Sequence, residues 1–170
     1  MLNAADAALV VIDVQGQLAR SMCDSDELIE NVSKLIRGAK VLGLPIILTE
    51  QYPEGLGPTV PEIAELIDAE PIPKRAFSCA GERAFVEALE AADREQVLLC
   101  GIEAHVCVVQ TARDLVDAGY EAHVVLDAVS SRTARNRRAG VRKAKDVGAE
   151  LTTVEMALFE MLGRAEGDAF

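Results

Sequence analysis

The hydrophobic positions of this chain form short continuous runs separated by longer amphipathic stretches. Residues 8–14 are almost entirely apolar and β-branched, and residues 44–49, 96–101, 120–126 and 149–153 repeat the pattern. Runs this short and this apolar are typical of strands buried on both faces of a parallel sheet. Residues 71–78 form a further extended segment, which contains Lys74.

Between these runs, apolar residues recur at helical spacing. In residues 25–42 they indicate a helix that Ser25 or Asp26 can cap and that Gly43 ends. The same reasoning predicts helices over residues 81–92, 104–118, 135–147 and 155–162, with a shorter turn at 62–67. Residues 50–61 are rich in proline and glycine, which predicts a loop that forms a pocket wall.

The alternation of strands and helices predicts an α/β fold. We expect a three-layer α/β/α arrangement around a mostly parallel, about six-stranded, Rossmann-like sheet. The 170 residues suit a single domain spanning 1–170, with a core at about 8–162. In such sheets the site lies at the carboxyl ends of the strands, where the prediction places Asp13, Lys74 and Cys107.

Charge and composition limit the kinds of partner that the protein is expected to bind. The chain has 28 acidic and 17 basic residues, and a net charge of -11 disfavours nucleic acid. No apolar run approaches the ~20 residues of a membrane-spanning helix, so no membrane partner is expected. Neither a secretory signal nor a phosphate-binding glycine motif is visible, which predicts a cytoplasmic protein without a nucleotide cofactor. The four cysteines lack disulfide or zinc spacing and are expected to be reduced thiols.

Cys107 carries the candidate chemistry, because it falls in the first turn of a predicted helix that follows a strand. A helix N-terminus, a cation and a nearby base lower the pKa of a thiol, and Cys107 is placed to have all three, with Lys74 and Asp13. Each residue alone has a simpler interpretation: a buried structural cysteine, a capping aspartate and a solvated lysine. Only their convergence favours a reactive site.

Three motifs surround these residues: Val-Val-Ile-Asp-Val-Gln at 10–15, Pro-Lys-Arg-Ala-Phe-Ser at 73–78 and Gly-Ile-Glu-Ala-His-Val-Cys-Val-Val-Gln-Thr at 101–111. With these motifs, the sequence resembles the isochorismatase-like cysteine hydrolase superfamily over about residues 8–162. Residues 49–59, 127–132 and 152–160 are most similar to the subgroup of isochorismatase domain-containing proteins. The resemblance implies the isochorismatase-like hydrolase fold.

The resemblance also implies roles for single residues. Asp13 would be the base, Lys74 the cation that holds it, and Cys107 the nucleophile. The backbone N–H groups of Glu103 and Cys107 would form an oxyanion hole, and a non-proline cis peptide would join Ile102 to Glu103. These roles imply a hydrolase that cleaves a small amide or related C–N bond through a thioester. Carbamoyl or ureido chemistry stays open, as does a non-catalytic or redox-sensing binding protein of the same fold.

The chain departs from its metal-dependent relatives. Nicotinamidases of this superfamily hold a metal with histidines after the second strand, but residues 49–60 contain none, so no metal is expected. The pocket candidates are Gln51, Tyr52, Leu56, Phe77 and His105, with the Glu50 and Glu103 side chains as further possibilities. Core packing remains an alternative for Phe77, and a solvated loop for Glu50 and Gln51.

Two surface features bear on assembly. The apolar residues Met156, Phe159 and Met161 of the last predicted helix favour a homo-oligomer. The basic residues of 132–143 indicate a solvated helix face or an ion-paired contact between subunits.

Overall fold

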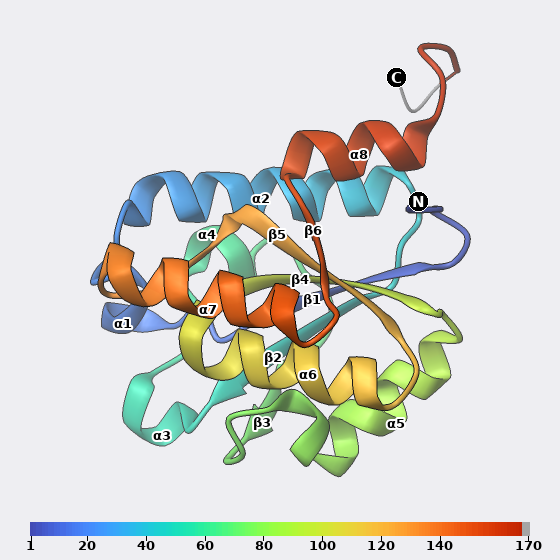
Figure 1. Ribbon diagram of the computed structural model, residues 1–170. Helices are drawn as coiled ribbons and strands as arrows, with labels where there is room; N and C mark the ends of the chain where they lie inside the picture. Colours follow the sequence, from blue (N-terminus) through green and yellow to red (C-terminus); the bar gives the residue numbers. More distant parts are fainter. Residues whose placement is uncertain (168–170) are drawn as a thin grey trace.

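Six parallel strands form one sheet, which lies between two layers of helices (Figure 1). The structure is a computed structural model that describes residues 1–167, so residues 168–170 of the predicted domain lie outside it. The strands are β1 (Ala7–Ile12), β2 (Ile46–Gln51), β3 (Ile72–Lys74), β4 (Gln96–Ile102), β5 (Glu121–Ser130) and β6 (Glu150–Thr152). Their order, β3-β2-β1-β4-β5-β6, confirms the predicted α/β class and the six-stranded parallel sheet.

Helices cover both faces of this sheet. They are α1 (Gly16–Arg20), α2 (Ser25–Val41), α3 (Pro53–Leu56), α4 (Pro61–Ala64), α5 (Arg83–Ala92), α6 (Val109–Asp117), α7 (Ala134–Asp146) and α8 (Val154–Leu162). α2 and α8 lie on one face, and α5, α6 and α7 lie on the other (Figure 1). None of the helices in residues 1–167 combines the length and the apolar composition that crossing a bilayer demands.

The central strand β1 shows why its sequence is apolar at every position. Leu9 and Val11 belong to the core beneath α2, whereas Val10 and Ile12 belong to the core beneath α5 and α6. Successive side chains of a strand point to opposite faces, and here both faces are covered. All of these side chains are therefore fully buried.

Some element boundaries differ from the sequence predictions. α2 follows Asp24, which has a left-handed backbone and no capping hydrogen bond from its side chain, so the predicted cap at Ser25 or Asp26 is wrong. The predicted loop over 50–61 begins within β2, which extends to Gln51, and contains the short helix α3. The helix α4 begins at Pro61 and corresponds to the short turn predicted at 62–67, and both helices have a proline at their start. β5 continues to Ser130, four residues past its predicted end at 126, and carries the chain to the carboxyl edge of the sheet.

That carboxyl edge brings together segments far apart in the sequence. Ile12 of β1 is in register with Thr49 of β2 and with Gly101 of β4, so these three strands end at one level. A Cβ at Gly101 would overlap the carbonyl oxygen of Ile12, which explains the glycine there. The direction of chain order reverses between β1 and β4, the place where open α/β sheets hold their ligands.

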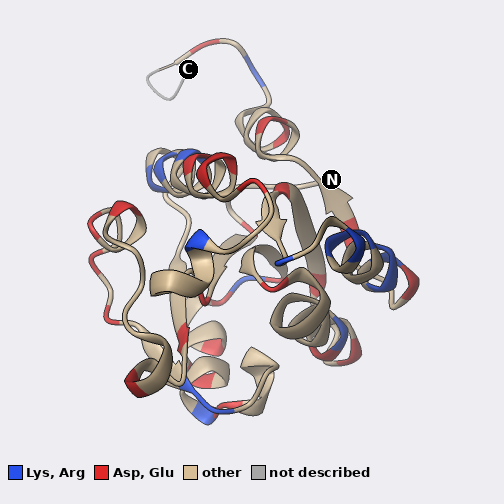
Figure 2. Ribbon diagram, turned by 90° about the vertical axis from the view of Figure 1, so that its left-hand side faces the viewer, with Lys and Arg blue, Asp and Glu red and all other residues tan. Residues whose placement is uncertain are grey.

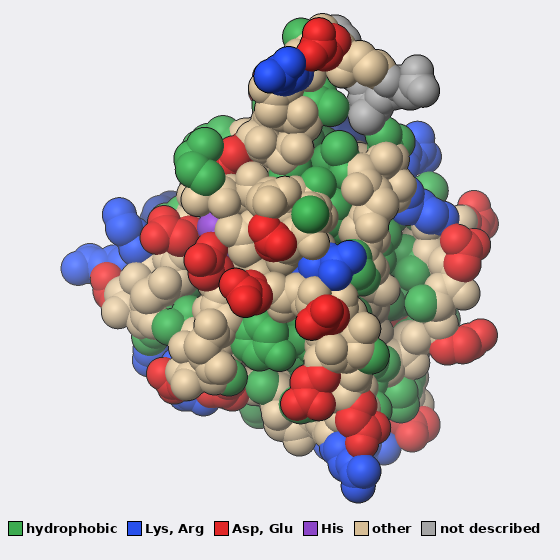
Figure 3. All heavy atoms as spheres, turned by 90° about the vertical axis from the view of Figure 1, so that its right-hand side faces the viewer, with side chains coloured by type: hydrophobic (Ala, Val, Ile, Leu, Met, Phe, Trp, Pro, Cys, Tyr) green, Lys and Arg blue, Asp and Glu red, His purple; other side chains and the backbone are tan. Residues whose placement is uncertain are grey.

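The surface charge is unevenly distributed. Basic residues gather on α7 (Figure 2), namely Arg135, Arg137, Arg138, Arg142, Lys143 and Lys145. Acidic side chains are spread over the side of the molecule that faces away from α1 and α3 (Figure 3). On the terminal helix, Met156 and Phe159 are 59% and 56% exposed, but Met161 is buried and does not belong to the predicted apolar surface.

Candidate active site

Asp13 follows β1 directly and is almost completely buried. Its backbone has a φ of 54°, a left-handed conformation that costs a non-glycine residue about 1–3 kcal/mol. The Thr49 hydroxyl donates a hydrogen bond of 2.8 Å to Asp13 Oδ1, and Lys74 Nζ lies 2.8 Å from Oδ2. The side chains of this ion pair are 3% and 1% exposed, so bulk water screens it little.

Hydrogen bonds to oxygen atoms hold the Lys74 ammonium group in place. Its ammonium group donates to Gln51 Oε1 at 2.6 Å and to the carbonyl oxygens of Ala76 and Phe77 at 3.2 and 3.1 Å. These bonds account for its three N–H donors, and within residues 1–167 Asp13 Oδ2 accepts no well-aligned hydrogen bond. Oδ2 therefore keeps a lone pair that can receive a proton.

The electrostatics of the pair keep Lys74 charged. Burial acts to lower the pKa of Lys74, but Asp13 and, to a smaller extent, Cys107 and Cys79 together more than offset this, so the pKa lies above its ordinary value. Burial raises the pKa of Asp13, against the opposing influence of Lys74. A carboxylate with a raised pKa is a stronger base, which suits a residue that takes up a proton.

Cys107 lies in a π-helical turn, Ala104–Val108, between β4 and α6, and is only 6% exposed. The pKa of its thiol is raised from 9.0 to about 12, chiefly by burial and also by the Asp13 charge, while Lys74 acts to lower it. The expectation of a lowered thiol pKa is therefore wrong. Lys74 is already neutralised by Asp13, so a resting thiolate would be an uncompensated buried anion.

Backbone hydrogen bonds and close packing against α7 fix the turn that carries Cys107. The carbonyl oxygen of Glu103 accepts hydrogen bonds from the N–H groups of Val106 and Val108, at 3.0 and 3.3 Å. The peptide bond between Ile102 and Glu103 is cis, at the position that the resemblance implies. A Cβ on Gly140 would lie 2.5 Å from backbone atoms of Ala104, so α7 packs directly against this turn.

Two buried polar residues that the sequence analysis did not identify as anchors hold the loop over 52–59. The side-chain amide of Gln15 donates to the carbonyl oxygens of Gln51 and Gly57, at 3.1 and 2.7 Å, and accepts from Gln51 N at 2.7 Å. Glu50 Oε1 accepts hydrogen bonds from the N–H and hydroxyl of Thr59, at 2.6 and 2.7 Å. Glu50 is 8% exposed, so its alternative interpretation as a solvated loop residue is wrong, whereas a role in reading a substrate stays a prediction.

The predicted pocket residues occupy different environments. Tyr52 and Phe77 are 45% and 55% exposed beside the Asp13–Lys74 pair, and Leu56 is half-buried. Gln51 holds Lys74 with its oxygen and donates to the Arg75 carbonyl with its nitrogen, so the protein itself engages both ends of this amide. His105 Nδ1 lies 3.0 Å from the Ser131 hydroxyl.

Glu103 does not present a free carboxylate to a pocket. Its side chain is 8% exposed and is bound by Arg132. Among residues 1–167, no group of three or more histidine, cysteine or acidic side chains has the arrangement of a metal site.

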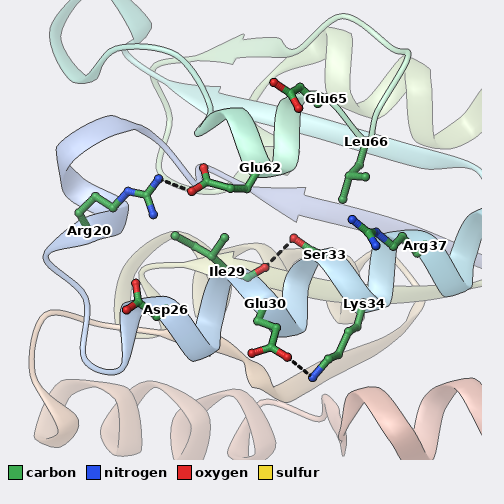
Figure 4. A pocket seen from close by; sticks show the side chains of 10 residues that line it. All are labelled: Arg20, Asp26, Ile29, Glu30, Ser33, Lys34, Arg37, Glu62, Glu65 and Leu66. Atoms are coloured by element: carbon green, nitrogen blue, oxygen red, sulfur yellow. Dashed lines mark hydrogen bonds and ion pairs between the residues drawn. The ribbon is translucent and has the colours of Figure 1, made fainter.

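A separate groove lies between α2 and α4 and has a volume of about 610 Å³ (Figure 4). Most of its charged side chains already pair with one another, as Arg20 does with Glu62 at 2.6 Å and Lys34 with Glu30 at 2.7 Å. It contains none of the three predicted catalytic residues. The groove is therefore distinct from the carboxyl-edge site.

Comparisons with known proteins agree with the fold. Residues 7–156 match the family model of the Isochorismatase domain. Isochorismatase domain-containing protein 2 of Xenopus laevis is 37% identical, over 99% of this chain and 82% of its own.

Two solved structures are also similar. The MAR1 ribonuclease of Caenorhabditis elegans is 38% identical with a TM-score of 0.92, covering 99% of this chain and 88% of its own. The YcaC gene product of Escherichia coli, an octameric hydrolase of unknown specificity, is 28% identical with a TM-score of 0.91, covering 96% and 82%. The chain therefore belongs to the isochorismatase family.

Proposed function

We propose that this protein is a cysteine-dependent hydrolase that cleaves a small amide or a related C–N bond through a thioester on Cys107. The observation that carries the proposal is the buried Asp13–Lys74 ion pair, next to the Cys107 thiol at the carboxyl edge of the sheet. A buried ion pair is weak evidence for stability, because desolvation offsets most of its attraction. Its presence beside a thiol therefore favours a chemical role.

The first step is proton transfer from Cys107 to Asp13. Before transfer the three groups carry one negative and one positive charge, and after transfer they still do, with the negative charge moved to sulfur. The raised thiol pKa describes loss of the proton while Asp13 stays charged. Internal transfer avoids that second anion, and Lys74 then balances the thiolate.

The thiolate next attacks the carbonyl carbon of the substrate. An S–C bond forms, the carbonyl π bond breaks, and negative charge appears on the oxygen. The backbone N–H groups of Glu103 and Cys107 would stabilise this oxyanion, and each donor is worth roughly 3 kcal/mol in comparable sites. The intermediate then collapses: the C–N bond breaks, and Asp13 returns its proton to the departing ammonia or amine.

Water completes the cycle by attacking the thioester. Asp13, again a carboxylate, removes a proton from the water, and the thiol leaves with that proton as the acid is released. Carbamoyl and ureido compounds can follow the same steps, since they present the same carbonyl and C–N bond. The substrate is therefore proposed only as a small molecule of this class.

The redox-sensing alternative fits the site less well. Sensor cysteines have low pKa values and are accessible to solvent. Cys107 is buried, and its pKa is raised to about 12. These properties favour a thiol that is activated only when Asp13 accepts its proton.

Ribonuclease activity is a second candidate, since a relative that is 38% identical is a MAR1 ribonuclease. The net charge of -11 opposes binding to a phosphate backbone. Ribonuclease activity is tested by incubating the native protein and a Cys107→Ala variant with labelled single-stranded RNA and measuring its cleavage. RNA cleavage that is lost in the variant would replace the amide proposal.

The remaining proposals concern assembly and location. The octameric relative and the exposed Met156 and Phe159 side chains support a homo-oligomer. All four cysteines are free thiols, which supports a reducing compartment such as the cytoplasm.

A panel of small primary amides, carbamoyl compounds and ureido compounds tests the activity directly. Release of ammonia by the native protein should disappear in Cys107→Ala and fall by a factor on the order of 10² or more in Asp13→Asn. Turnover that survives the loss of Cys107 would refute the proposal.

A further inference from the structure

Glu103 and Arg132 form a clamp across the carboxyl edge. Arg132 Nε and Nη2 approach Glu103 Oε1 at 3.2 and 3.1 Å, and the backbone N–H of Arg132 donates to Oε2 at 3.0 Å. Both carboxylate oxygens are thus bound by one residue. The Glu103 side chain is 8% exposed, whereas the Arg132 side chain is 61% exposed.

The clamp joins two loops that follow neighbouring strands. Glu103 comes directly after β4 and Arg132 two residues after β5, and Ile102 is paired with Ser130 in the sheet. A second contact runs alongside, because His105 Nδ1 lies 3.0 Å from the Ser131 hydroxyl. The segment leading into the Cys107 turn is therefore held by side chains from the loop after β5.

This arrangement has an energetic consequence. A carboxylate that is largely buried must keep its partners, because an unpaired buried charge is costly. When Arg132 is shortened, the Glu103 carboxylate keeps only the backbone N–H bond at Oε2. Loss of the ion pair then favours movement of the Glu103 side chain toward solvent, which would displace the Glu103 backbone. A displacement of about 1 Å at a reacting centre can cost on the order of 100-fold in rate.

We propose that Arg132 is a positioning residue, which acts through the Glu103 carboxylate to hold the Glu103 N–H where the substrate oxyanion forms. The proposal rests on the hydrolase function proposed above. It predicts that Arg132 matters for reactions at Cys107 that generate an oxyanion, and not for reactions that generate none.

Two probes separate these cases. Iodoacetamide alkylates sulfur by displacement of iodide: an S–C bond forms, a C–I bond breaks, and no oxyanion appears. Butyraldehyde instead adds the thiol across its carbonyl, so an S–C bond forms, the π bond breaks, and the oxygen becomes an anion or takes up the proton. Only the second product uses an oxyanion hole.

The variants form a graded series. Arg132→Lys keeps the positive charge, Arg132→Ala keeps only the backbone N–H bond, and Glu103→Ala removes all three contacts while leaving the Glu103 N–H itself. Arg142→Ala is the matched control, because Arg142 is an exposed arginine of α7 whose nearest acidic partner, Asp146, lies 4.0 Å away. Circular dichroism of each variant establishes that it is folded.

The measured quantities are the rate of Cys107 alkylation by iodoacetamide and the dissociation constant of the butyraldehyde adduct. For Arg132→Ala we expect the adduct to weaken on the order of 10- to 100-fold, with the alkylation rate within about twofold of the native protein. The affinity for butyraldehyde should be intermediate in Arg132→Lys and lowest in Glu103→Ala. In Arg142→Ala it should equal that of the native protein.

Other outcomes overturn the proposal. An unchanged adduct in Arg132→Ala would show that the clamp does not position the oxyanion site. Parallel losses in both reactions would show that Arg132 only supports the fold around Cys107. A native protein that alkylates but forms no adduct, or that does neither, would overturn the proposed function itself.

Discussion

Replacing Lys74 by methionine tests the electrostatic design of the site. Methionine keeps an unbranched side chain of similar volume but removes the charge, so Asp13 loses the ammonium group that lies 2.8 Å away. At an effective dielectric constant of ~20, Coulomb's law gives about 6 kcal/mol of attraction at that distance. Desolvation of both ions offsets part of it, and removing one partner of a buried pair typically costs about 3–5 kcal/mol.

We expect the free energy of unfolding of Lys74→Met to fall by about 3–5 kcal/mol at neutral pH. In a chain of this length, that corresponds to a drop in Tm of roughly 6–20 °C. Urea denaturation measures the change. The double variant Asp13→Asn with Lys74→Met should recover stability relative to Lys74→Met alone, because no buried charge remains unpaired.

The loss in free energy of unfolding caused by Lys74→Met, called the deficit below, should also depend on pH. Without Lys74, only the hydrogen bonds from Thr49 and Cys107 oppose the effect of burial on Asp13, so the folded-state pKa rises further above the ordinary value of 3.8. A group whose folded pKa is raised contributes stability below its unfolded pKa and loses it as the pH rises. The deficit of Lys74→Met should therefore grow as the pH increases above about 4. A deficit below about 1 kcal/mol, or a double variant no more stable than the single one, would refute the reasoning.

Two further predictions follow from the same geometry. Burial and the Asp13 charge together raise the pKa of Cys107 from 9.0 to about 12, so the contribution of this thiol to stability is complete below pH 9.0 and is lost as the pH rises toward 12. Cys107→Ala should therefore flatten the alkaline arm of a stability–pH curve, and an unchanged arm would argue against a buried protonated thiol. Gly140→Ala places a Cβ 2.5 Å from the Ala104 backbone, and should destabilise the protein by about 1–3 kcal/mol and slow alkylation of Cys107. Arg138→Ala, at an exposed position of the same helix, is its control, and a Gly140→Ala variant that behaves like this control would contradict the packing described here.

The fold was predictable from the sequence because its signals are local. A strand buried on both faces must be apolar at every position, as residues 8–12 are, and a helix against one face must be apolar at helical spacing, as α2 is. The same patterns locate the ends of the strands, and they therefore predict that Asp13 and Cys107 lie at the same edge of the sheet. Lys74 belongs to a three-residue edge strand, whose sequence predicts only an extended segment.

The contacts around the site were not predictable in the same way. Gln15 lies shortly after β1 and Glu50 near the end of β2, and nothing local in the sequence shows that these polar residues bind the backbone of residues 51–59 from a buried position. The raised pKa of Cys107 is also a property of the assembled site, because it depends on burial and on a lysine already neutralised by Asp13. Sequence motifs identify the reacting groups, whereas their resting charge states require the structure.

The most direct test of the central claim is intact-mass spectrometry after an acid quench, with any amide that the protein turns over. The native protein should carry a mass increase equal to the acyl group, located on the peptide that contains Cys107, and Cys107→Ala should carry none. Turnover with no acyl adduct on Cys107 at any quench time, together with an active Cys107→Ala variant, would contradict the thioester mechanism.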